Sequence, residues 1–503
     1  MPGKRSCDAL KHNGTIGVQQ SFHLHDNLEQ VALALDSHPM VDYPDDIINN
    51  PDLNVSEIVN RTWTHMSGSS VWLPEHNVFL LVTRVLFYTN GCRANPVISF
   101  LRGQLYSPEW EHLENYTLRW KGEDFMFPTI FSVASDYETG GGFYGPEDPR
   151  VVLEEGKEGA EPVIVFNMIG QASDWRRAMY IYRPFSKHTK ILTISDRNRE
   201  ETEKNWSPFF LASESTQPSE FIHFVYSFEP LQILKCHLRC GDCEFVFKQE
   251  VPSNSLTHYK KDDGSLRGGS NFVPVPIPRS SPHQQMGMYA AFHRTTIFTD
   301  CGGKFYRPEF VVMINIGSQF HLAFTSQPVS FGSTMIELTP EDDPCKKGAI
   351  LLPMSIAQWN TTDRQDVMTM TFTVDDQTVQ AARIHGLLSF VHGLPHSQAL
   401  SRHDGSVDAT QDELTNILAS WAGDEVRACA VEAALNLTIT TKESWEASHP
   451  PEEAEVDASN ELLHRAKQQQ VQMTDSTPPP PPAERPVDPF DDMGAVLEPQ
   501  PQR

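Results

Sequence analysis

This sequence lacks a surplus of basic residues. Its 503 residues include 40 Lys and Arg against 66 Asp and Glu, which gives a formal net charge of -26 and an isoelectric point of about 5.1. Proteins that bind nucleic-acid backbones usually carry a basic patch, which releases counterions from phosphate. The composition therefore argues against a nucleic-acid partner and favours a neutral polar one.

Long hydrophobic runs are also missing. No window approaches the roughly 20 apolar residues needed to span a bilayer, and the basic N-terminus has no apolar run of the kind found in signal peptides or anchors. In contrast, Asn-X-Ser/Thr sequons exceed the roughly two or three expected by chance. The sequons lie at Asn13, Asn54, Asn60, Asn115, Asn205, Asn360 and Asn436. They favour the secretory lumen, and an N-terminal anchor missing from this chain would reconcile them with the absent signal.

Cysteine is scarce, with eight residues in the chain, too few for a disulfide scaffold. Cys236, Cys240 and Cys243 cluster in the segment CHLRCGDC. A zinc site would need a fourth ligand, and His237 is poorly placed to bind the same ion as the adjacent Cys236. We expect a disulfide or free structural thiols rather than a metal site.

Several common catalytic motifs are absent. The sequence has no GxxxxGK[ST], GxSxG or HExxH, and no GxGxxG follows a predicted strand. These absences remove the usual signals for P-loop, α/β-hydrolase, zincin and dinucleotide chemistry.

Short β-rich runs are abundant from about Val71 onward, separated by segments rich in Gly, Pro, Asn and Asp. They include NVFLLVTRVLFY, EPVIVFNM, AMYIYRPF, EFIHFVYSF, EFVVMINIG and DVMTMTFTV. Many strands without intervening helical patterns predict an all-β domain. A sandwich, a barrel and a propeller all fit the pattern, but about 330 residues suit a propeller of four-stranded blades best. No WD-type repeat supports that choice.

Changes in composition and hydrophobic pattern divide the chain into four parts. Residues 1–60 are interpreted as a polar, loosely structured lead-in, and residues 61–395 as the β domain. Residues 396–440 contain good helix formers with periodic apolar positions, which predict a helical appendage. Residues 441–503 are acidic and proline-rich, with five consecutive prolines at 478–482, a composition typical of a disordered tail.

The segment FYGPEDPR is the first candidate for chemistry. Pro149 fixes its own φ and biases Asp148 to an extended backbone, so the carboxylates of Glu147 and Asp148 should point in different directions. A carboxylate aimed into a cleft could exchange protons during sugar chemistry, and Arg150 could hold it ionised. The alternative is an ordinary proline turn with a surface ion pair.

Other candidates are polar or glycine residues beside apolar strands. They are Arg102, Asn167, Arg177, Lys204, Asn205, Trp206, Arg267, Gly268, Gly269, His293 and Arg294. Basic side chains distributed among the strands of an acidic protein suggest a site for a phosphate-bearing ligand. Trp206 could stack on a sugar or pack inside the fold, and the Arg-Gly-Gly segment could approach an anion or form a tight hairpin.

A family resemblance runs in order through residues 71–385. The chain resembles the fungal β-mannosyltransferases of glycosyltransferase family 91 in FYGPEDPRVVLE, EPVIVFNM, RRAMYIYRPF, EKNWSPFF, FIHFVYSFEPLQILKC and SLRGGSNFV. The EDPR, KNW and RGG segments also resemble glycoside hydrolase family 130, the β-mannoside phosphorylases, which are five-bladed β-propellers. The resemblance therefore implies a five-bladed propeller, followed by the helical appendage and tail, which have no clear family counterpart.

The resemblance also implies an activity. It is the inverting transfer of mannose from GDP-mannose to mannan or oligomannoside, with β-1,2 linkage, in fungal cell-wall synthesis. No cofactor is implied beyond the donor substrate, and no metal, because no DxD motif follows a strand where a metal-using transferase would need it. The expected location is the Golgi or secretory lumen, with a membrane contact only if an anchor is missing from this chain.

Asp148 takes the proton-transfer role under this resemblance, because it matches the aspartate of the EDPR motif. The substrate-binding pool is Arg102, Glu147, Arg150, Asn167, Arg177, Lys204, Asn205, Trp206, Arg267, Gly268, Gly269, His293 and Arg294. Two alternatives stay open: a β-mannoside phosphorylase or hydrolase on the same fold, and a non-catalytic carbohydrate-binding propeller.

Overall fold

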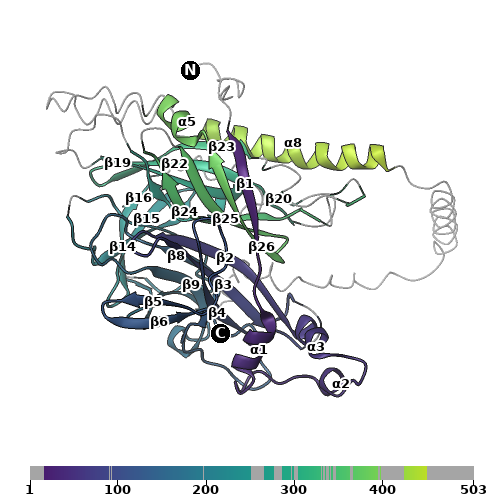
Figure 1. Cartoon of the computed structure of the whole chain (residues 1–503). Coiled ribbons are helices and arrows are strands. Elements are labelled where there is room, and N and C mark those ends of the chain that lie inside the picture. The colour runs from purple at the N-terminus through teal and green to yellow at the C-terminus, as the bar shows by residue number, and fades with distance from the viewer. Residues whose placement is uncertain are drawn as a thin grey trace, which may run out of the picture. The chain divides into compact units, whose positions relative to one another are not determined.

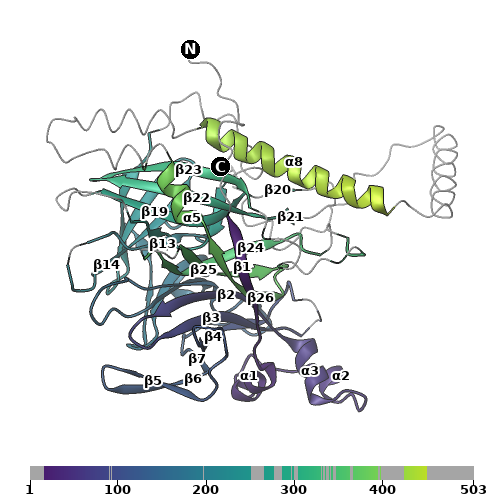
Figure 2. The same cartoon turned by 45° about the horizontal axis from the view of Figure 1, so that its top comes forward.

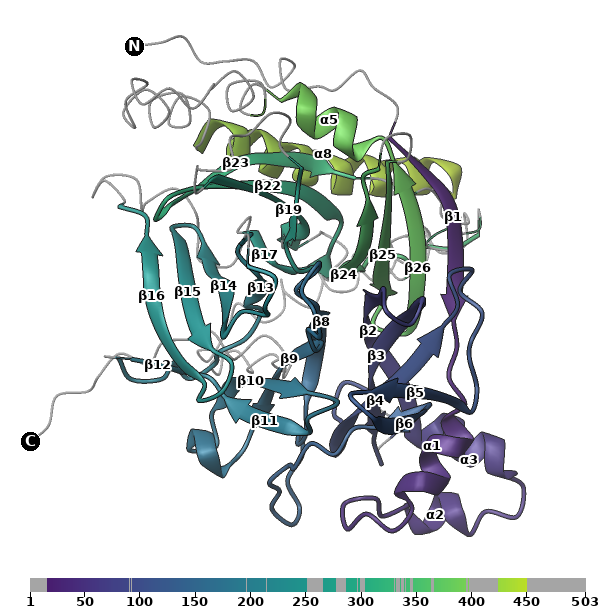
Figure 3. The same ribbon diagram turned by 60° about the vertical axis from the view of Figure 1, so that its left-hand side comes forward.

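A computed structural model of the chain describes residues 16–250, 266–276, 286–298, 304–394, 397 and 424–449, with short gaps. The gaps are residues 90, 92, 196, 214, 296, 330, 332–334, 336–338, 340, 344–346 and 363–365. The strands form five main sheets (Figure 1), which are arranged around a central axis (Figure 3). The predicted fold class, a five-bladed β-propeller, is confirmed.

Each blade is an antiparallel sheet of neighbouring strands, numbered here in chain order of its innermost strand. Blade 1 has β2 (Trp63–Leu73), β3 (Val78–Phe87), β4 (Ile98–Tyr106) and β7 (Thr129–Ile130). Blade 2 has β8 (Glu147–Val152), β9 (Val163–Ile169), β10 (Arg177–Arg183) and β11 (His188–Ile191). Blade 3 has β13 (Ser207–Phe209), β14 (Phe221–Phe228), β15 (Leu231–His237) and β16 (Asp242–Lys248), with β12 (Thr193–Ile194) parallel to its outer edge.

The remaining blades complete the ring. Blade 4 has β17 (Leu266–Gly269), β19 (Met286–Thr295), β22 (Pro308–Ile316) and β23 (Gln319–Pro328), and β18 (Val273–Pro274) also pairs with β19. Blade 5 has β24 (Leu351–Asn360), β25 (Val367–Val374), β26 (Thr378–His385) and β1 (Gly17–Leu24). The edge strands β2, β8, β13, β17 and β24 face the central axis (Figure 3).

Strand β1 closes the propeller by pairing the start of the chain with its end. It lies antiparallel to β26, with Phe22 opposite Ala381. This differs from the interpretation of residues 1–60 as a loosely structured lead-in. The sequence GVQQSFHL is mostly polar because β1 is the outer strand of its blade and buries little, so its strand character was not visible in the hydrophobic pattern.

Both faces of the inner strands are buried, because each blade packs against its neighbours. Strand β3 is buried at all 10 positions. An apolar cluster lies at each of the five junctions between blades. Leu101 and Phe166 belong to the cluster between blades 1 and 2, and Phe292 and Phe372 to the cluster between blades 4 and 5. Burying a side chain of this kind contributes about 1.5–3 kcal/mol. Burial on two faces explains why the strands form continuous apolar runs.

Three short helices follow β1 and pack beside blade 1 (Figure 2). They are α1 (Leu28–Leu35), α2 (Asp45–Ile48) and α3 (Val55–Thr62). Asn54 caps α3 through a reciprocal capping box with Glu57, and such caps typically contribute about 1 kcal/mol. Val31 of α1 joins an apolar cluster with Trp63 and Phe87 of blade 1. Helices α1 and α3 therefore extend the core of the propeller, whereas α2 buries no residue.

The other elements are two hairpins, a 3₁₀ turn and two helices. They are β5 (Tyr116–Trp120) with β6 (Glu123–Phe127), β20 (Ile297–Phe298) with β21 (Lys304–Phe305), the turn Gln171–Ser173, α5 (Leu387–Gly393) and α8 (Asp424–Ser448). The chain divides into two compact units, residues 1–436 and residues 437–503, and the boundary between them falls within α8.

The predicted helical appendage and tail are described only in part. Helix α8 continues to Ser448, beyond the expected end of the appendage at 440, so its last turns lie in the segment interpreted as disordered. Residues 398–423 and 450–503 lie outside the described residues. Among the helices that the structure does describe, none is both long and apolar enough to cross a membrane.

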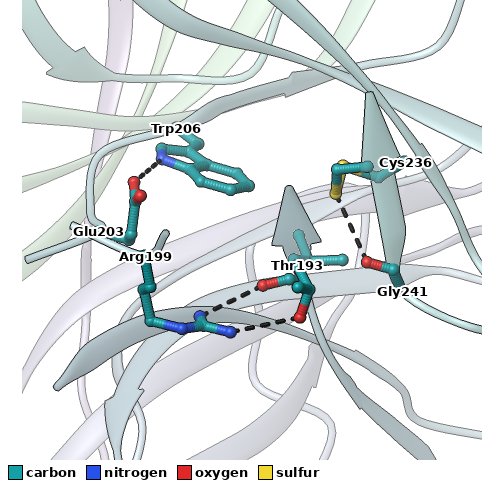
Figure 4. The surroundings of a disulfide bond; sticks show 8 residues. Thr193, Arg199, Glu203, Trp206, Cys236 and Gly241 are labelled. Atoms are coloured by element: carbon teal, nitrogen blue, oxygen red, sulfur yellow. Dashed lines mark hydrogen bonds between the residues drawn. A yellow bond between two sulfur atoms is a disulfide. The ribbon is translucent and has the colours of Figure 1, made fainter. Parts of the chain in front are cut away.

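A disulfide joins Cys236 of β15 to Cys243 of β16 (Figure 4). The two residues are opposite each other in the register of these strands, which brings their side chains together on one face. Cys240, in the turn between them, is exposed and has a free thiol. The expectation of a disulfide or free structural thiols in CHLRCGDC matches this arrangement, in which Cys236 and Cys243 are bonded and Cys240 is free.

Candidate active site

The candidate catalytic segment begins β8, at the inner edge of blade 2. Glu147 pairs with Asn167 and Arg150 with Val165, which leaves one extra residue in β8 and forms a bulge. Bulges reorient side chains locally. Asp148 lies in this bulge with φ 50°, so the prediction of an extended backbone at this position is wrong. A residue before proline is mainly excluded from the right-handed region, and the left-handed region tolerates aspartate.

Left-handed backbone conformations recur around Asp148. Ser67, Asn205 and Asp376 have φ values of 54°, 64° and 52°, and the Ser67 hydroxyl donates to Oδ1 of Asp148 at 3.3 Å. Such conformations in residues other than glycine concentrate at functional sites, where the surrounding structure enforces them. Gly145 also has positive φ, and a Cβ there would lie 2.0 Å from a backbone oxygen. Only glycine therefore fits at this turn before β8.

Arg150 ties the bulge to blade 4. Its Nε donates to the carbonyl oxygen of Gly269 at 2.5 Å, and its Nη1 donates to the carbonyl oxygens of Asp148 and Pro149 at 3.3 and 3.0 Å. Burial lowers the pKa of Arg150 to about 10, although the charge of Asp148 opposes that shift. The guanidinium remains charged at neutral pH and fixes the backbone that presents Asp148.

Glu147 points away from Asp148 into a buried ion-pair network. Its Oε1 accepts from Nη2 of Arg177 at 2.8 Å, and its Oε2 lies 3.7 Å from Nη1 of Arg84. The side-chain amide of Asn167 donates to the backbone oxygen of Glu147 at 3.3 Å. Glu147 is 4% exposed, so it orders the arginines and is poorly placed to meet a substrate.

Asp148 shares these two arginines with Glu147, but it is a partly exposed residue with four cations around it. Burial alone would raise its pKa, but Arg84, Arg150, Lys204 and Arg177 together hold it below the ordinary value of 3.8. Opposite charges at short range favour the ionised form. Asp148 is therefore a carboxylate at physiological pH and can accept a proton or a hydrogen bond.

Lys204 and Asn205 approach Asp148 from the segment before β13. Burial and the charge of Arg177 lower the pKa of Lys204, although Asp148 opposes the shift. A Cβ added to Gly268 would lie 2.9 Å from Oδ1 of Asn205. The absence of a side chain at Gly268 therefore allows blades 3 and 4 to meet closely at the site.

Arg294 and Asp376 bring blades 4 and 5 to the same site. The guanidinium carbon of Arg294 lies 3.8 Å from the centroid of the Tyr306 ring, and Arg267 lies opposite Arg294 in the β17–β19 register. Asp376 belongs to the tight turn between β25 and β26. Burial and the charge of Asp148 raise the pKa of Asp376 to about 6, against the attraction of Arg294.

His293 and Trp206 are buried beneath the site. The His293 ring lies 4.5 Å from the Phe228 ring and is 0% exposed, and burial lowers its pKa to about 3. It is therefore neutral and cannot act as a cation. Trp206 is 3% exposed, packs against Phe224, and its indole N–H donates to Glu203 (Figure 4). The burial of Trp206 matches the alternative in which it packs inside the fold instead of stacking on a sugar.

Arg102 is separate from this cluster. Its guanidinium lies 3.4 Å from Oδ2 of Asp26 and donates to the Gln30 side chain at 2.6 Å. Both partners belong to the N-terminal helical segment at α1. The contacts of Arg102 fasten that segment to blade 1.

Most of the residues selected from the sequence lie together at the site around Asp148, but three residues of this site were not selected. The ones brought together are Glu147, Asp148, Arg150, Asn167, Arg177, Lys204, Asn205, Gly268, Gly269 and Arg294. The missed ones are Ser67, Arg84 and Asp376. Arg84 offered a signal, because a charged residue inside the apolar run NVFLLVTRVLFY must find a buried partner.

A small cavity of about 10 Å³ lies beside Asp148, with Val165, Met179 and Trp206 in its lining. This is roughly the space that one water molecule needs. The cavity is therefore too small to hold a sugar ring, and Asp148 and Lys204 are the charged residues beside it that are partly exposed. Within the described ranges, no three His, Cys, Asp or Glu side chains form a group that could hold a metal ion; metal independence stays a prediction.

Comparison with known sequences decides the family. The family model for β-mannosyltransferases matches residues 6–180 and 174–435. The match covers most of the segment 396–440, so the expectation that this appendage has no family counterpart is wrong. This chain belongs to the β-mannosyltransferase family. It is 30% identical over 403 residues to β-mannosyltransferase 1 of Komagataella phaffii, covering 77% of this chain and 60% of that protein. It is 32% identical over 357 residues to β-mannosyltransferase 3 of Candida albicans, covering 68% and 62%. The chain thus spans about 60% of the length of these curated relatives.

Solved structures with similar architecture are more distant. A GDP-Man-dependent mannosyltransferase, MPT-1 from Leishmania mexicana, aligns with TM-score 0.35 and 10% identity over 65% of this chain and 85% of that one. A glycosyl hydrolase from Bacteroides ovatus aligns with TM-score 0.41 and 11% identity over 64% and 83%. Similarities of this size carry no argument about the chemistry of this family member.

Proposed function

We propose that this chain is an inverting β-1,2-mannosyltransferase that transfers mannose from GDP-mannose to a mannan or oligomannoside acceptor. Family membership supports the reaction class. The observation that carries the proposal is Asp148, a partly exposed residue held ionised within a surplus of cations. Five cations, Arg84, Arg150, Arg177, Lys204 and Arg294, lie among four carboxylates, Glu147, Asp148, Asp375 and Asp376. In a chain with net charge -26, this local surplus supports an anionic ligand such as a diphosphate.

Asp148 would act as the base. In an inverting transfer, an acceptor hydroxyl attacks the anomeric carbon from the side opposite the departing GDP, and the hydroxyl proton must pass to a base. The lowered pKa of Asp148 keeps it ionised and ready to receive that proton. The bond from the sugar to the diphosphate breaks as the new glycosidic bond forms, and the diphosphate leaves as an anion. Cations can stabilise that anion without protonating it.

The basic residues divide into two groups by exposure. Arg84, Arg150 and Arg177 are buried at 4%, 7% and 4% exposure; Arg84 and Arg177 pair with Glu147, and Arg150 donates to backbone oxygens. We assign them to holding the site and setting the charge of Asp148. A second group, Lys204, Arg267 and Arg294, is partly exposed. This group is the better source of direct contacts to the diphosphate.

The biological setting belongs to the same proposal. The sequons and the family resemblance support the secretory lumen and cell-wall mannan, without a cofactor beyond the donor. Under this proposal the mannan chain is the acceptor, and Asp148 deprotonates the hydroxyl of its terminal sugar.

Incubating the purified full chain with GDP-mannose and a short mannoside tests the reaction. We expect release of GDP together with a mannoside extended by one β-linked residue. Formation of mannose 1-phosphate from β-mannosides and inorganic phosphate, without transfer from GDP-mannose, would instead support a phosphorylase. Binding of mannoside with neither reaction would support a carbohydrate-binding propeller.

A further inference from the structure

A second pocket, of about 400 Å³, lies between blades 3 and 4. Ligand pockets typically measure roughly 300–1,000 Å³. Its walls come from β14, β15 and β16 of blade 3, from the loop after β13, and from the turn between β22 and β23 of blade 4. Blades 3 and 4 are neighbours in the ring (Figure 3), so the pocket opens along one of the blade junctions.

The pocket lies at the opposite end of the strands from Asp148. Asp148 is at the start of β8, and Glu154 of the pocket follows its end. Likewise Lys204 precedes β13, and Leu211 of the pocket follows it. Six residues of extended chain span about 20 Å, so the pocket is separate from the site around Asp148.

Buried polar atoms without partners line the floor of this pocket. Glu154 is 6% exposed, and its Oε2 accepts from the backbone N–H of Ser219 at 2.6 Å. Neither Oε1 of Glu154 nor Nδ1 of His223 has a hydrogen-bond partner within the described part of the chain. Unpaired buried polar atoms are costly and call for an explanation. Phe320, 3% exposed, adds an aromatic wall.

The charge in the pocket is balanced. Glu154 and Lys235 line the pocket, and Nζ of Lys235 lies 4.0 Å from the centroid of the Phe221 ring. Lys157 at the rim acts on Glu154, and Oε1 of Glu244 lies 3.9 Å from Nζ of Lys235, so two ammonium groups meet two carboxylates. Burial lowers the pKa of His223 to about 4, so His223 is neutral. An anion would meet Glu154, and a cation would meet Lys235. A neutral ligand with hydroxyl groups suits both, because each hydroxyl can donate or accept.

The rim of the pocket is held in place before any ligand binds. Nζ of Lys157 donates to the carbonyl oxygens of Ser213 and Ser215 at 2.5 and 2.6 Å. The backbone N–H of Ala212 donates to the hydroxyl of Tyr289 at 2.9 Å. Preorganisation of this kind lowers the entropic cost of binding.

We propose that this pocket is a second saccharide-binding site, which holds a mannan acceptor at a distance from Asp148. The mixture of an aromatic wall, unpaired hydrogen-bonding atoms and balanced charge fits the apolar faces and hydroxyl groups of a sugar. The identity of the saccharide as mannan rests on the proposed function. A polymer can occupy both sites at once and gain effective concentration, whereas a disaccharide is too short to bridge about 20 Å.

Two variants of the full chain test the site. Ser318→Trp places a bulky side chain in the pocket from an exposed turn, and Gln319→Trp places the same bulk at the next position, which does not line the pocket. Glu154→Gln removes the unpaired carboxylate oxygen, and Glu158→Gln makes the same charge change at an exposed side chain.

The measurements are KM for soluble mannan, KM for mannobiose and calorimetric binding of mannan. We expect Ser318→Trp and Glu154→Gln to raise KM for mannan about tenfold, as the loss of a hydrogen-bonded anchor would do. KM for mannobiose and for GDP-mannose should not change, and both control variants should match the original chain. Equal KM values for mannan in all variants would overturn the proposal, even if one substitution proved unstable.

The two proposals fail in different ways. If the chain transfers no mannose but Ser318→Trp still weakens mannan binding about tenfold relative to Gln319→Trp, the second site stands and the proposed activity is wrong. If transfer occurs and neither mannan KM nor mannan binding responds to the variants, the activity stands and the second site is wrong.

Discussion

Asp148 and Glu154 are carboxylates near the two ends of the same strand, β8, and their surroundings differ. Around Asp148, four cations outweigh the effect of burial and lower the pKa. Glu154 is bound by one backbone N–H, and burial raises its pKa despite Lys157. The neighbouring charges, from blade 2 itself as well as from blade 1 and the segment before β13, therefore decide whether a carboxylate is held charged.

The difference also separates two kinds of ligand. The Asp148 end has a surplus of positive charge suited to a diphosphate, whereas the Glu154 end is balanced and suited to a neutral sugar. Removing cations around Asp148 should therefore bring the charge at that end of β8 closer to the balanced charge around Glu154.

Replacing Arg150 should have the largest effect on stability. Arg150→Met keeps the bulk but removes the donor to three backbone oxygens, each worth about 1–3 kcal/mol when left buried and unpaired. We expect the free energy of unfolding to fall by about 4 kcal/mol and the pKa of Asp148 to rise, as measured by urea unfolding and by the pH profile of activity. Arg183→Met, at a partly exposed ion pair, should cost far less. Equal losses in the two variants would contradict the role of Arg150.

Breaking the buried network at Glu147 should have the next largest effect. Glu147→Gln leaves the buried guanidinium groups of Arg84 and Arg177 without a countercharge, and breaking such a pair costs roughly 3–5 kcal/mol. Because glutamine still offers an oxygen as an acceptor, we expect the free energy of unfolding, measured with urea, to fall by about 3 kcal/mol. The exposed Glu220→Gln is the control. A loss below about 1 kcal/mol would show that the pair does not hold the arginines.

Asp376 should give the fold a pH dependence of definite sign. Its pKa is raised from 3.8 to about 6 by burial and by Asp148, so the folded state binds this proton more tightly than the unfolded chain. The carboxylate therefore destabilises the fold increasingly as pH rises from 3.8 to about 6. The free energy of unfolding of Asp376→Asn should exceed that of the original chain by at most about 3 kcal/mol at pH 7. This difference should vanish below pH 3.8. Unfolding curves with a gain independent of pH would refute this.

The smallest change in stability is expected at the far end of β8. Because burial disfavours the charge of Glu154, Glu154→Gln removes a cost while glutamine keeps an acceptor for Ser219. The free energy of unfolding at pH 7 should stay within about 1 kcal/mol of the original or increase. A loss above about 2 kcal/mol, relative to Glu158→Gln, would mean that the charge of Glu154 is needed for folding.

The sequence predicted most of the propeller because burial on both faces makes the strands apolar and continuous. It did not predict β1, whose polar sequence reflects an outer edge, and so the segment 1–60 was misinterpreted. Ring closure depends on the pairing of β1 with β26, more than 350 positions apart, and no local pattern encodes that contact.

The candidate site was predictable where glycine, proline and charge coincide, as in FYGPEDPR. Its finer arrangement was not, because it depends on residues from different blades. Arg84 lies inside a predicted apolar run, Asp376 lies in a hairpin turn with no local signal of the site, and Arg102 was selected as a ligand contact although its contacts are with Asp26 and Gln30. The direction of the Asp148 side chain follows from a bulge, which is visible only in the register of β8 with β9.

The most direct test compares the original chain with Asp148→Asn in single-turnover transfer from GDP-mannose to a short mannoside, with GDP-mannose binding measured in parallel. The amide keeps the shape of the side chain but cannot take the acceptor proton. We predict a loss of transfer of roughly 100-fold or more, with binding of GDP-mannose largely kept. Unchanged transfer in Asp148→Asn would contradict the assignment of Asp148 as the base.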